Sequence, residues 1–134
     1  MKDCFKNVMI ADDSGTARMI IRKCLEIAGL TESKFLEAKN GEEVLLTLKK
    51  EKIGLLVTDL NMPVLDGKAL LERVKADPAL AGVPVIVITS GNNPAREKEL
   101  KGLGAASVLN KPVSPAAVAR ACDVCKNIIL EVKP

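Results

Sequence analysis

The sequence contains no histidine, tryptophan or tyrosine and has two phenylalanines. Nucleic-acid bases therefore find few aromatic rings on which to stack, and the net charge of +3 is scattered along the chain rather than gathered in a basic block. Both features argue against nucleic acid as the main partner. No apolar run approaches the ~18 residues needed to cross a bilayer, so we expect no membrane insertion.

The N-terminus lacks the apolar core of a signal peptide, which predicts a cytoplasmic protein whose cysteines are reduced. Cys122 and Cys125 have the spacing of half a metal site. The chain offers neither a histidine nor a second closely spaced cysteine pair to complete four zinc ligands. We interpret the two thiols as small, partly buried residues of a helix, with metal or redox chemistry as the alternative.

The length of 134 residues and the hydrophobic content of 48% suit one domain over residues 1–134 with its own core. Short apolar segments alternate with longer amphipathic ones. The predicted strands cover residues 7–11, 34–38, 55–58, 83–89 and 105–110. Strict alternation predicts an α/β fold in which a doubly wound, five-stranded parallel sheet has the flavodoxin-like order 2-1-3-4-5.

The predicted helices start near Gly15, Asn40, Asp66, Asn93 and Ser114. Four of them carry an apolar stripe that should face the sheet, whereas the fourth is polar and should pack lightly. The stripe of the first helix consists of Ala17, Ile20, Ile21, Cys24, Leu25 and Ala28. The stripe of the last helix, residues 114–132, consists of Ala117, Ala121, Val124, Cys125, Ile128 and Val132.

Polar side chains stand where four of the five predicted strands end. They are Asp12 and Asp13 after the first strand, Asp59 at the third, Thr89 at the fourth and Lys111 after the fifth. In a parallel sheet of this topology these strand ends form one rim, where ligands collect. Each residue alone has an ordinary interpretation, as a turn former, a helix cap or a solvated lysine. Their joint placement indicates a site.

Three carboxylates on one rim repel one another, since each pair at ~4 Å costs roughly 4 kcal/mol at an effective dielectric constant of ~20. A hard cation such as Mg²⁺ relieves that repulsion. Asp59 is ionised at pH 7 and can attack phosphorus without a base, forming an aspartyl phosphate. Mg²⁺, Lys111 and the Thr89 hydroxyl could then each neutralise one phosphoryl oxygen.

A longer pattern contains these residues. It consists of Asp12-Asp13, Asp59-Leu60-Asn61-Met62-Pro63-x-x-Asp66-Gly67, Thr89-Ser90 and Lys111-Pro112. The pattern resembles the receiver domain of two-component response regulators over residues 6–129. The resemblance implies that Asp59 accepts a phosphoryl group from a sensor histidine kinase or a histidine phosphotransfer protein.

The resemblance also implies a role for each neighbouring residue. Asp13, Asp59 and the Asn61 carbonyl would bind Mg²⁺ directly, and Asp12 would act largely through water. The phosphate-binding and switch residues would be Thr89, Ser90 and Lys111. The Lys111-Pro112 peptide is expected to be cis, as in the family.

Within the family the chain is most similar to the single-domain, CheY-like type. This implies a phosphorylation switch without an attached output domain, a monomer or weak dimer. It would bind a downstream protein through its fourth helix, fifth strand and fifth helix. The pathway stays open between motility and a phosphorelay or developmental control. Val108 occupies the position of the family's aromatic switch residue, so the usual coupled threonine–aromatic rotation cannot operate in its usual form.

Two other functions compete with the switch. One is an interaction module that works without phosphorylation, which would not need the intact set of Asp13, Asp59, Thr89 and Lys111. The other is a phosphohydrolase with an aspartyl nucleophile, a class that resembles Asp-x-Asp after the first strand. Here Asp59 follows the third strand, so we expect no enzyme beyond self-phosphorylation and autodephosphorylation.

Overall fold

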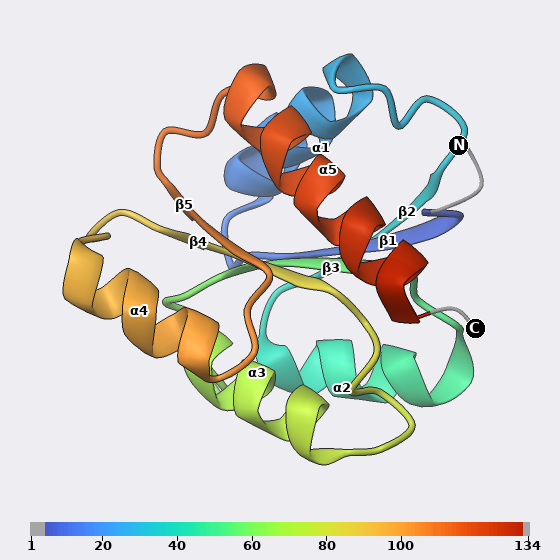
Figure 1. Cartoon of the computed structure of the whole chain (residues 1–134), viewed down its shortest axis with the longest axis vertical. Coiled ribbons are helices and arrows are strands. Elements are labelled where there is room, and N and C mark those ends of the chain that lie inside the picture. Colours follow the sequence, from blue (N-terminus) through green and yellow to red (C-terminus); the bar gives the residue numbers. More distant parts are fainter. Residues whose placement is uncertain (1–4, 133–134) are drawn as a thin grey trace.

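The computed structural model describes residues 5–132, with side chains through residue 129. A five-stranded parallel sheet lies at its centre in the order β2-β1-β3-β4-β5 (Figure 1). The strands are β1 (Asn7–Ala11), β2 (Lys34–Ala38), β3 (Leu55–Asp59), β4 (Val85–Thr89) and β5 (Ser107–Asn110). The predicted flavodoxin-like topology is confirmed.

Helices cover both faces of the sheet. They are α1 (Gly15–Ile27), α2 (Gly41–Lys50), α3 (Gly67–Ala76), α4 (Pro94–Gly102) and α5 (Pro115–Val132). Helices α1 and α5 lie on one face, and α2, α3 and α4 lie on the other (Figure 1). Because side chains alternate along a strand, Leu55 and Val57 of β3 pack beneath α1 and α5, whereas Leu56 packs beneath α2 and α3.

Strands β4 and β5 begin at Val85 and Ser107 rather than at residues 83 and 105 as predicted. Proline cannot donate a hydrogen bond to a strand ladder, which keeps Pro84 out of β4. The Val83 N–H donates to the Leu80 carbonyl in the preceding turn at 2.9 Å. The Ala105 N–H donates to the Leu100 carbonyl at 3.0 Å, which closes the end of α4. The predicted strands were too long because the residues of these turns are apolar, like those of the strands that follow.

The predicted buried stripes were wrong at two positions. Ile20 of α1 is 47% exposed and Val124 of α5 is 43% exposed. Both lie beside the residues that fill the core of this face, namely Ile21, Cys24, Leu25, Val118, Ala121, Cys122 and Cys125. A helix buries only a narrow stripe, so an apolar residue at its margin stays in solvent. The predicted position Val132 lies outside the described side chains.

Cys122 and Cys125 are buried free thiols of this core. Burial raises the pKa of Cys122 to about 11 and that of Cys125 to about 12. Both thiols are therefore protonated at neutral pH, which makes them poor nucleophiles. Their interpretation as core residues is confirmed.

Helix α4 is held lightly, as predicted. Leu100 is its buried residue, and the remainder of the helix is largely polar and exposed. Lys68 of α3 and Glu99 of α4 form an ion pair at 3.0 Å, with both side chains about half exposed. Exposed ion pairs contribute roughly 0–1 kcal/mol. Apart from the buried Leu100, helix α4 is therefore held by weak contacts.

Val64, in the loop between β3 and α3, has a φ of 69° and is 74% exposed. The Leu65 N–H donates to the Pro63 carbonyl at 2.7 Å, which closes a strained γ-turn around Val64. The positive φ costs a β-branched residue roughly 1–2 kcal/mol, whereas Asn tolerates a positive φ more readily. We expect Val64→Asn to raise the free energy of unfolding by about 1 kcal/mol, measured by urea denaturation followed by circular dichroism. Val64→Ala, which is not β-branched, should gain less. A loss of stability in Val64→Asn would contradict the strain.

Candidate functional site

Three carboxylates converge at the carboxyl ends of β1 and β3. Asp12 and Asp13 follow β1 directly, and Asp59 is the last residue of β3. One oxygen from each carboxylate lies within 4.8 Å of the other two. Asp12 and Asp59 are 1% and 5% exposed, and Asp13 is exposed. The cluster is therefore a buried carboxylate pair with Asp13 at its solvent side.

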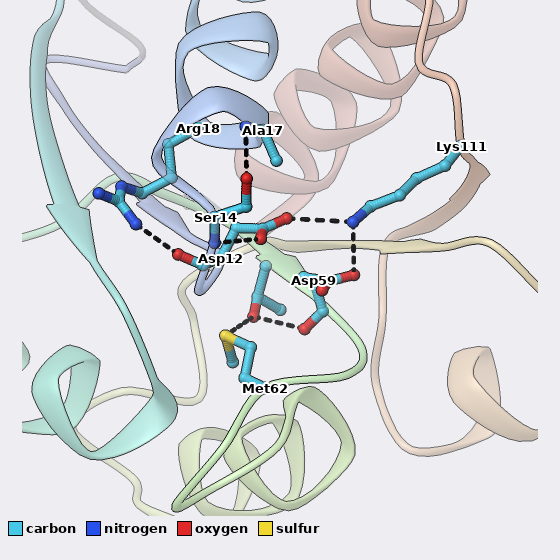
Figure 2. A network of polar contacts seen from close by, with 8 residues as sticks. Asp12, Ser14, Ala17, Arg18, Asp59, Met62 and Lys111 are labelled. Atoms are coloured by element: carbon cyan, nitrogen blue, oxygen red, sulfur yellow. Dashed lines mark hydrogen bonds and ion pairs between the residues drawn. The ribbon is translucent and has the colours of Figure 1, made fainter.

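Lys111, just beyond β5, bridges the two buried carboxylates (Figure 2). Its Nζ lies 3.2 Å from Asp12 Oδ2 and 3.3 Å from Asp59 Oδ1. Partial burial of this ammonium lowers its pKa, but the two carboxylates outweigh that effect, so the net pKa of Lys111 is raised and it is a cation at neutral pH. The Lys111-Pro112 peptide is cis, as expected.

Thr89 lies at the end of β4, next to Lys111. The Lys111 N–H donates to the Thr89 carbonyl at 3.0 Å. The preceding residue, Ile88, pairs in register with Asp59. The Thr89 side chain is buried, and its Oγ1 accepts a hydrogen bond from the Gly91 N–H at 3.2 Å. This hydroxyl therefore belongs to the same rim.

Ser90 and Asn61 lie on the loops that follow β4 and β3. Both residues are exposed. The structure thus brings Asp12, Asp13, Asp59 and Lys111 together, with Thr89 beside them. The roles predicted for Ser90 and for the Asn61 carbonyl stay predictions.

Two residues with no role in the sequence-based prediction support this site. Arg18 of α1 donates from Nη1 to the Asp12 carbonyl at 2.6 Å (Figure 2). At Gly67, a Cβ atom would lie 2.3 Å from the Asp59 carbonyl oxygen. Gly67 stands inside the sequence pattern, but only the fold shows which backbone approaches it. Arg18 has one sequence signal, because it lies in the helix that starts directly after the acids.

The pKa of the Asp59 carboxyl is raised above its ordinary value. Burial is the largest cause that raises its pKa, followed by the negative charge of Asp12, while Lys111 opposes both. Ionisation of Asp59 is therefore less favourable in the folded chain than in the unfolded one. A cation bound among the carboxylates would reverse this effect.

Asp59→Asn should consequently stabilise the metal-free protein at neutral pH. Below the ordinary pKa of an aspartate the carboxyl is neutral in both states, and the two proteins should unfold alike. As pH rises through the elevated pKa of folded Asp59, the wild type should fall progressively below the variant. Thermal unfolding between pH 3 and 8 measures this difference. Mg²⁺ should raise the melting temperature of the wild type more than that of the variant, and a wild type more stable than Asp59→Asn in metal-free buffer would contradict the assignment.

Residues 8–123 match the model of the response regulator receiver domain. The chain belongs to this family. It is 33% identical to the two-component response regulator ORR6 of rice (Oryza sativa subsp. japonica) over 117 residues, which cover 87% of this chain and 69% of that regulator. It is 34% identical to the chemotaxis protein CheY homolog of Campylobacter jejuni over 110 residues, or 81% of this chain and 82% of that protein.

Solved structures agree with this membership. The chemotaxis response regulator CheY4 of Vibrio cholerae superimposes with a TM-score of 0.78 at 26% identity, covering 90% of this chain and 98% of that one. The protein is therefore a receiver domain of the two-component type with a CheY-like fold. Among its described residues, no helix is long and apolar enough to span a membrane.

Proposed function

We propose that this receiver domain is a phosphorylation switch whose phosphoryl acceptor is Asp59. The observation that carries the proposal is the placement of Lys111 between the carboxylates of Asp12 and Asp59, at 3.2 and 3.3 Å. An anionic phosphoryl group bound to Asp59 requires a cation in this position. Asp59 ends a buried strand that pairs with β1 and β4, which suits a reaction that depends on positioning.

The donor residues fit Mg²⁺. Three carboxylates gathered within 4.8 Å, one of them exposed, supply the hard oxygen ligands that this ion prefers. Asp13 and Asp59 would hold it together with the Asn61 carbonyl, and Asp12 would act largely through water. When bound, Mg²⁺ supplies charge neutralisation for the carboxylates and for an incoming phosphoryl group.

The donor would be a phosphohistidine of a sensor kinase or a phosphotransfer protein. An Asp59 carboxylate oxygen attacks phosphorus, and the bond from phosphorus to the histidine nitrogen breaks with its electron pair left on that nitrogen. The carboxylate needs no base for this attack. Lys111 exchanges part of its contact with Asp12 and Asp59 for a phosphoryl oxygen, and the Thr89 hydroxyl turns toward another oxygen.

The signal from phosphorylated Asp59 to the partner-binding surface cannot pass through an aromatic side chain at position 108, because that residue is a valine. Val108 is buried against the α2–α4 face, in register with Val87. The loop that follows Thr89 offers another connection to α4. Within it the Asn92 N–H donates to Asn110 Oδ1 at 3.2 Å, and Asn92 Nδ2 donates to Glu97 Oε1 at 3.1 Å. Movement of the Thr89 hydroxyl toward phosphate would release its bond from Gly91 and so disturb this link.

Helix α4 is the element that this movement would shift, because it is lightly packed. The downstream protein would then bind through α4, β5 and α5. Complete switching from 1:99 to 99:1 needs ~5.5 kcal/mol of differential stabilisation, so a partial shift is expected until the partner binds. A cytoplasmic location and a monomer or weak dimer belong to the same proposal.

Phosphoryl incorporation tests the proposal. A small phosphodonor supplied with Mg²⁺ should label the wild-type chain and leave Asp59→Asn unlabelled. A module that works without phosphorylation would acquire no label in either form. A phosphohydrolase would instead turn over an external phosphate ester.

A further inference from the structure

We propose that Arg18 is a positioning residue of the acidic site, where it fixes the peptide between Asp12 and Asp13 and so sets the affinity for Mg²⁺. The inference rests on the proposed function, because it assumes that these carboxylates bind the ion. Arg18 Nη1 donates to the Asp12 carbonyl at 2.6 Å, and Arg18 Nε contacts Glu37 Oε1 at 2.6 Å. The Arg18 side chain is 15% exposed and its bond to Asp12 is partly buried, whereas Glu37 is 46% exposed.

The Asp12 carbonyl belongs to the peptide whose nitrogen is that of Asp13. Rotation of this peptide would carry the exposed Asp13 carboxylate away from Asp59. The Asp12 N–H is tied to the Ala38 carbonyl at 3.1 Å, and the Asp12 carbonyl is tied to Arg18. The backbone is thus fixed on both sides of the residue that begins the acidic pair.

Arg18 and Lys111 approach Asp12 from opposite sides (Figure 2). Lys111 contacts a carboxylate oxygen, Oδ2, and so competes with any cation for that ligand. Arg18 contacts only the backbone oxygen of Asp12, whose carboxylate oxygens accept hydrogen bonds from the Ser14 N–H and from Lys111 instead. Because the Arg18 charge is paired with that of Glu37, Arg18 can orient the Asp12 peptide without occupying a metal ligand and with little net charge to repel a cation.

The guanidinium is suited to this position by its shape. The planar group donates through Nη1 to the Asp12 carbonyl, after β1, and through Nε to Glu37 of β2 at the same time. A lysine ammonium is a single point charge and cannot reproduce this pair of directed bonds. Glu37 holds the planar group in place from β2. Arg18→Lys should consequently fail to restore the wild-type affinity.

Titration of the full chain with Mg²⁺ alone, followed by calorimetry, tests the role. Mn²⁺ monitored by electron paramagnetic resonance gives a second readout. We expect Arg18→Met to weaken binding of either ion about tenfold, as is typical when the group that orients a metal ligand is lost. Glu37→Ala, which keeps the Arg18 donor to Asp12 but removes the acceptor that holds Arg18 Nε, should weaken binding less.

Arg22→Met is the matched control. Arg22 lies on the same helix, stacks 4.9 Å from the Phe35 ring centroid and pairs with Glu26 at 3.5 Å. Its replacement removes the same charge and should leave the affinity unchanged. The amide resonance of Asp13 in a ¹⁵N spectrum should shift in Arg18→Met but not in Arg22→Met. A role in folding alone would not produce this difference.

The outcomes separate the two proposals. A wild type that binds neither Mg²⁺ nor Mn²⁺ would overturn the proposed metal site itself. Wild-type affinity in Arg18→Met, or an equal loss in Arg22→Met, would overturn the role of Arg18 while leaving that site intact. If Arg18→Met does not fold, Glu37→Ala decides, because wild-type affinity in a variant without the acceptor of Arg18 Nε would contradict the role of the fixed guanidinium.

Discussion

Gly67→Ala should lower the free energy of unfolding by about 2–3 kcal/mol, more than an ordinary surface substitution. The new Cβ would lie 2.3 Å from the Asp59 carbonyl oxygen and 2.8 Å from Leu60 Cα. Both contacts are with backbone, which cannot rotate out of the way as a side chain can. The Gly67 N–H also donates to the Leu60 carbonyl at 2.8 Å, so α3 starts in direct contact with the end of β3.

The same clash should reach the site. Relief requires α3 to move away from β3 or the Asp59 peptide to turn, and a turn of that peptide displaces the Asp59 carboxylate from Lys111. Gly67→Ala should therefore also slow phosphorylation, since displacement by about 1 Å can cost about a hundredfold in rate. An alanine that left both stability and rate at wild-type values would contradict the close contact between α3 and the end of β3.

Gly82→Ala is the control for this prediction. A Cβ at Gly82 meets nothing within 4 Å. The free energy of unfolding of Gly82→Ala should stay within about 0.5 kcal/mol of the wild type. Circular dichroism in urea is the suitable probe for both variants, because the chain has no tryptophan or tyrosine to report through fluorescence.

The topology could be predicted from the sequence because the helix caps and the order of apolar segments agreed with the fold. Asn93 caps α4 through the Arg96 N–H at 2.8 Å, and Asn40 caps α2 through the Glu43 N–H at 2.9 Å. The β-branched run of β4 is buried along its whole length. Once the strand order is 2-1-3-4-5, the carboxyl ends of the strands place Asp59 and Lys111 on one rim without further information.

Other features depend on neighbours that a sequence pattern does not identify. Ile20 has the spacing of a core residue, but its exposure depends on how α1 is rotated against α5. Arg18 can be read as a solvated helix arginine until the strand order brings Glu37 of β2 beside it. The need for glycine at position 67 follows from an approach of 2.3 Å between a helix and a strand end. Each of these is a matter of tertiary packing rather than local preference.

Phosphoryl transfer to Asp59 is the chemical step on which the proposed switch depends. Its carboxylate is nearly buried, its pKa is raised by burial and by Asp12, and Lys111 contacts it at 3.3 Å. Transfer of the phosphoryl group places additional negative charge at this position. The reaction should therefore require both Mg²⁺ and the lysine, and Lys111→Met should lower the steady-state level of phosphorylated protein.

Intact-mass spectrometry after incubation with phosphoramidate and Mg²⁺ measures this step. The wild type should gain the mass of one phosphoryl group, lose it on treatment with hydroxylamine, and gain none when the metal is chelated. Asp59→Asn should gain none, although Asp12 and Asp13 remain available as carboxylates. Addition of the group to Asp59→Asn at the wild-type level would contradict the assignment of Asp59 as the acceptor.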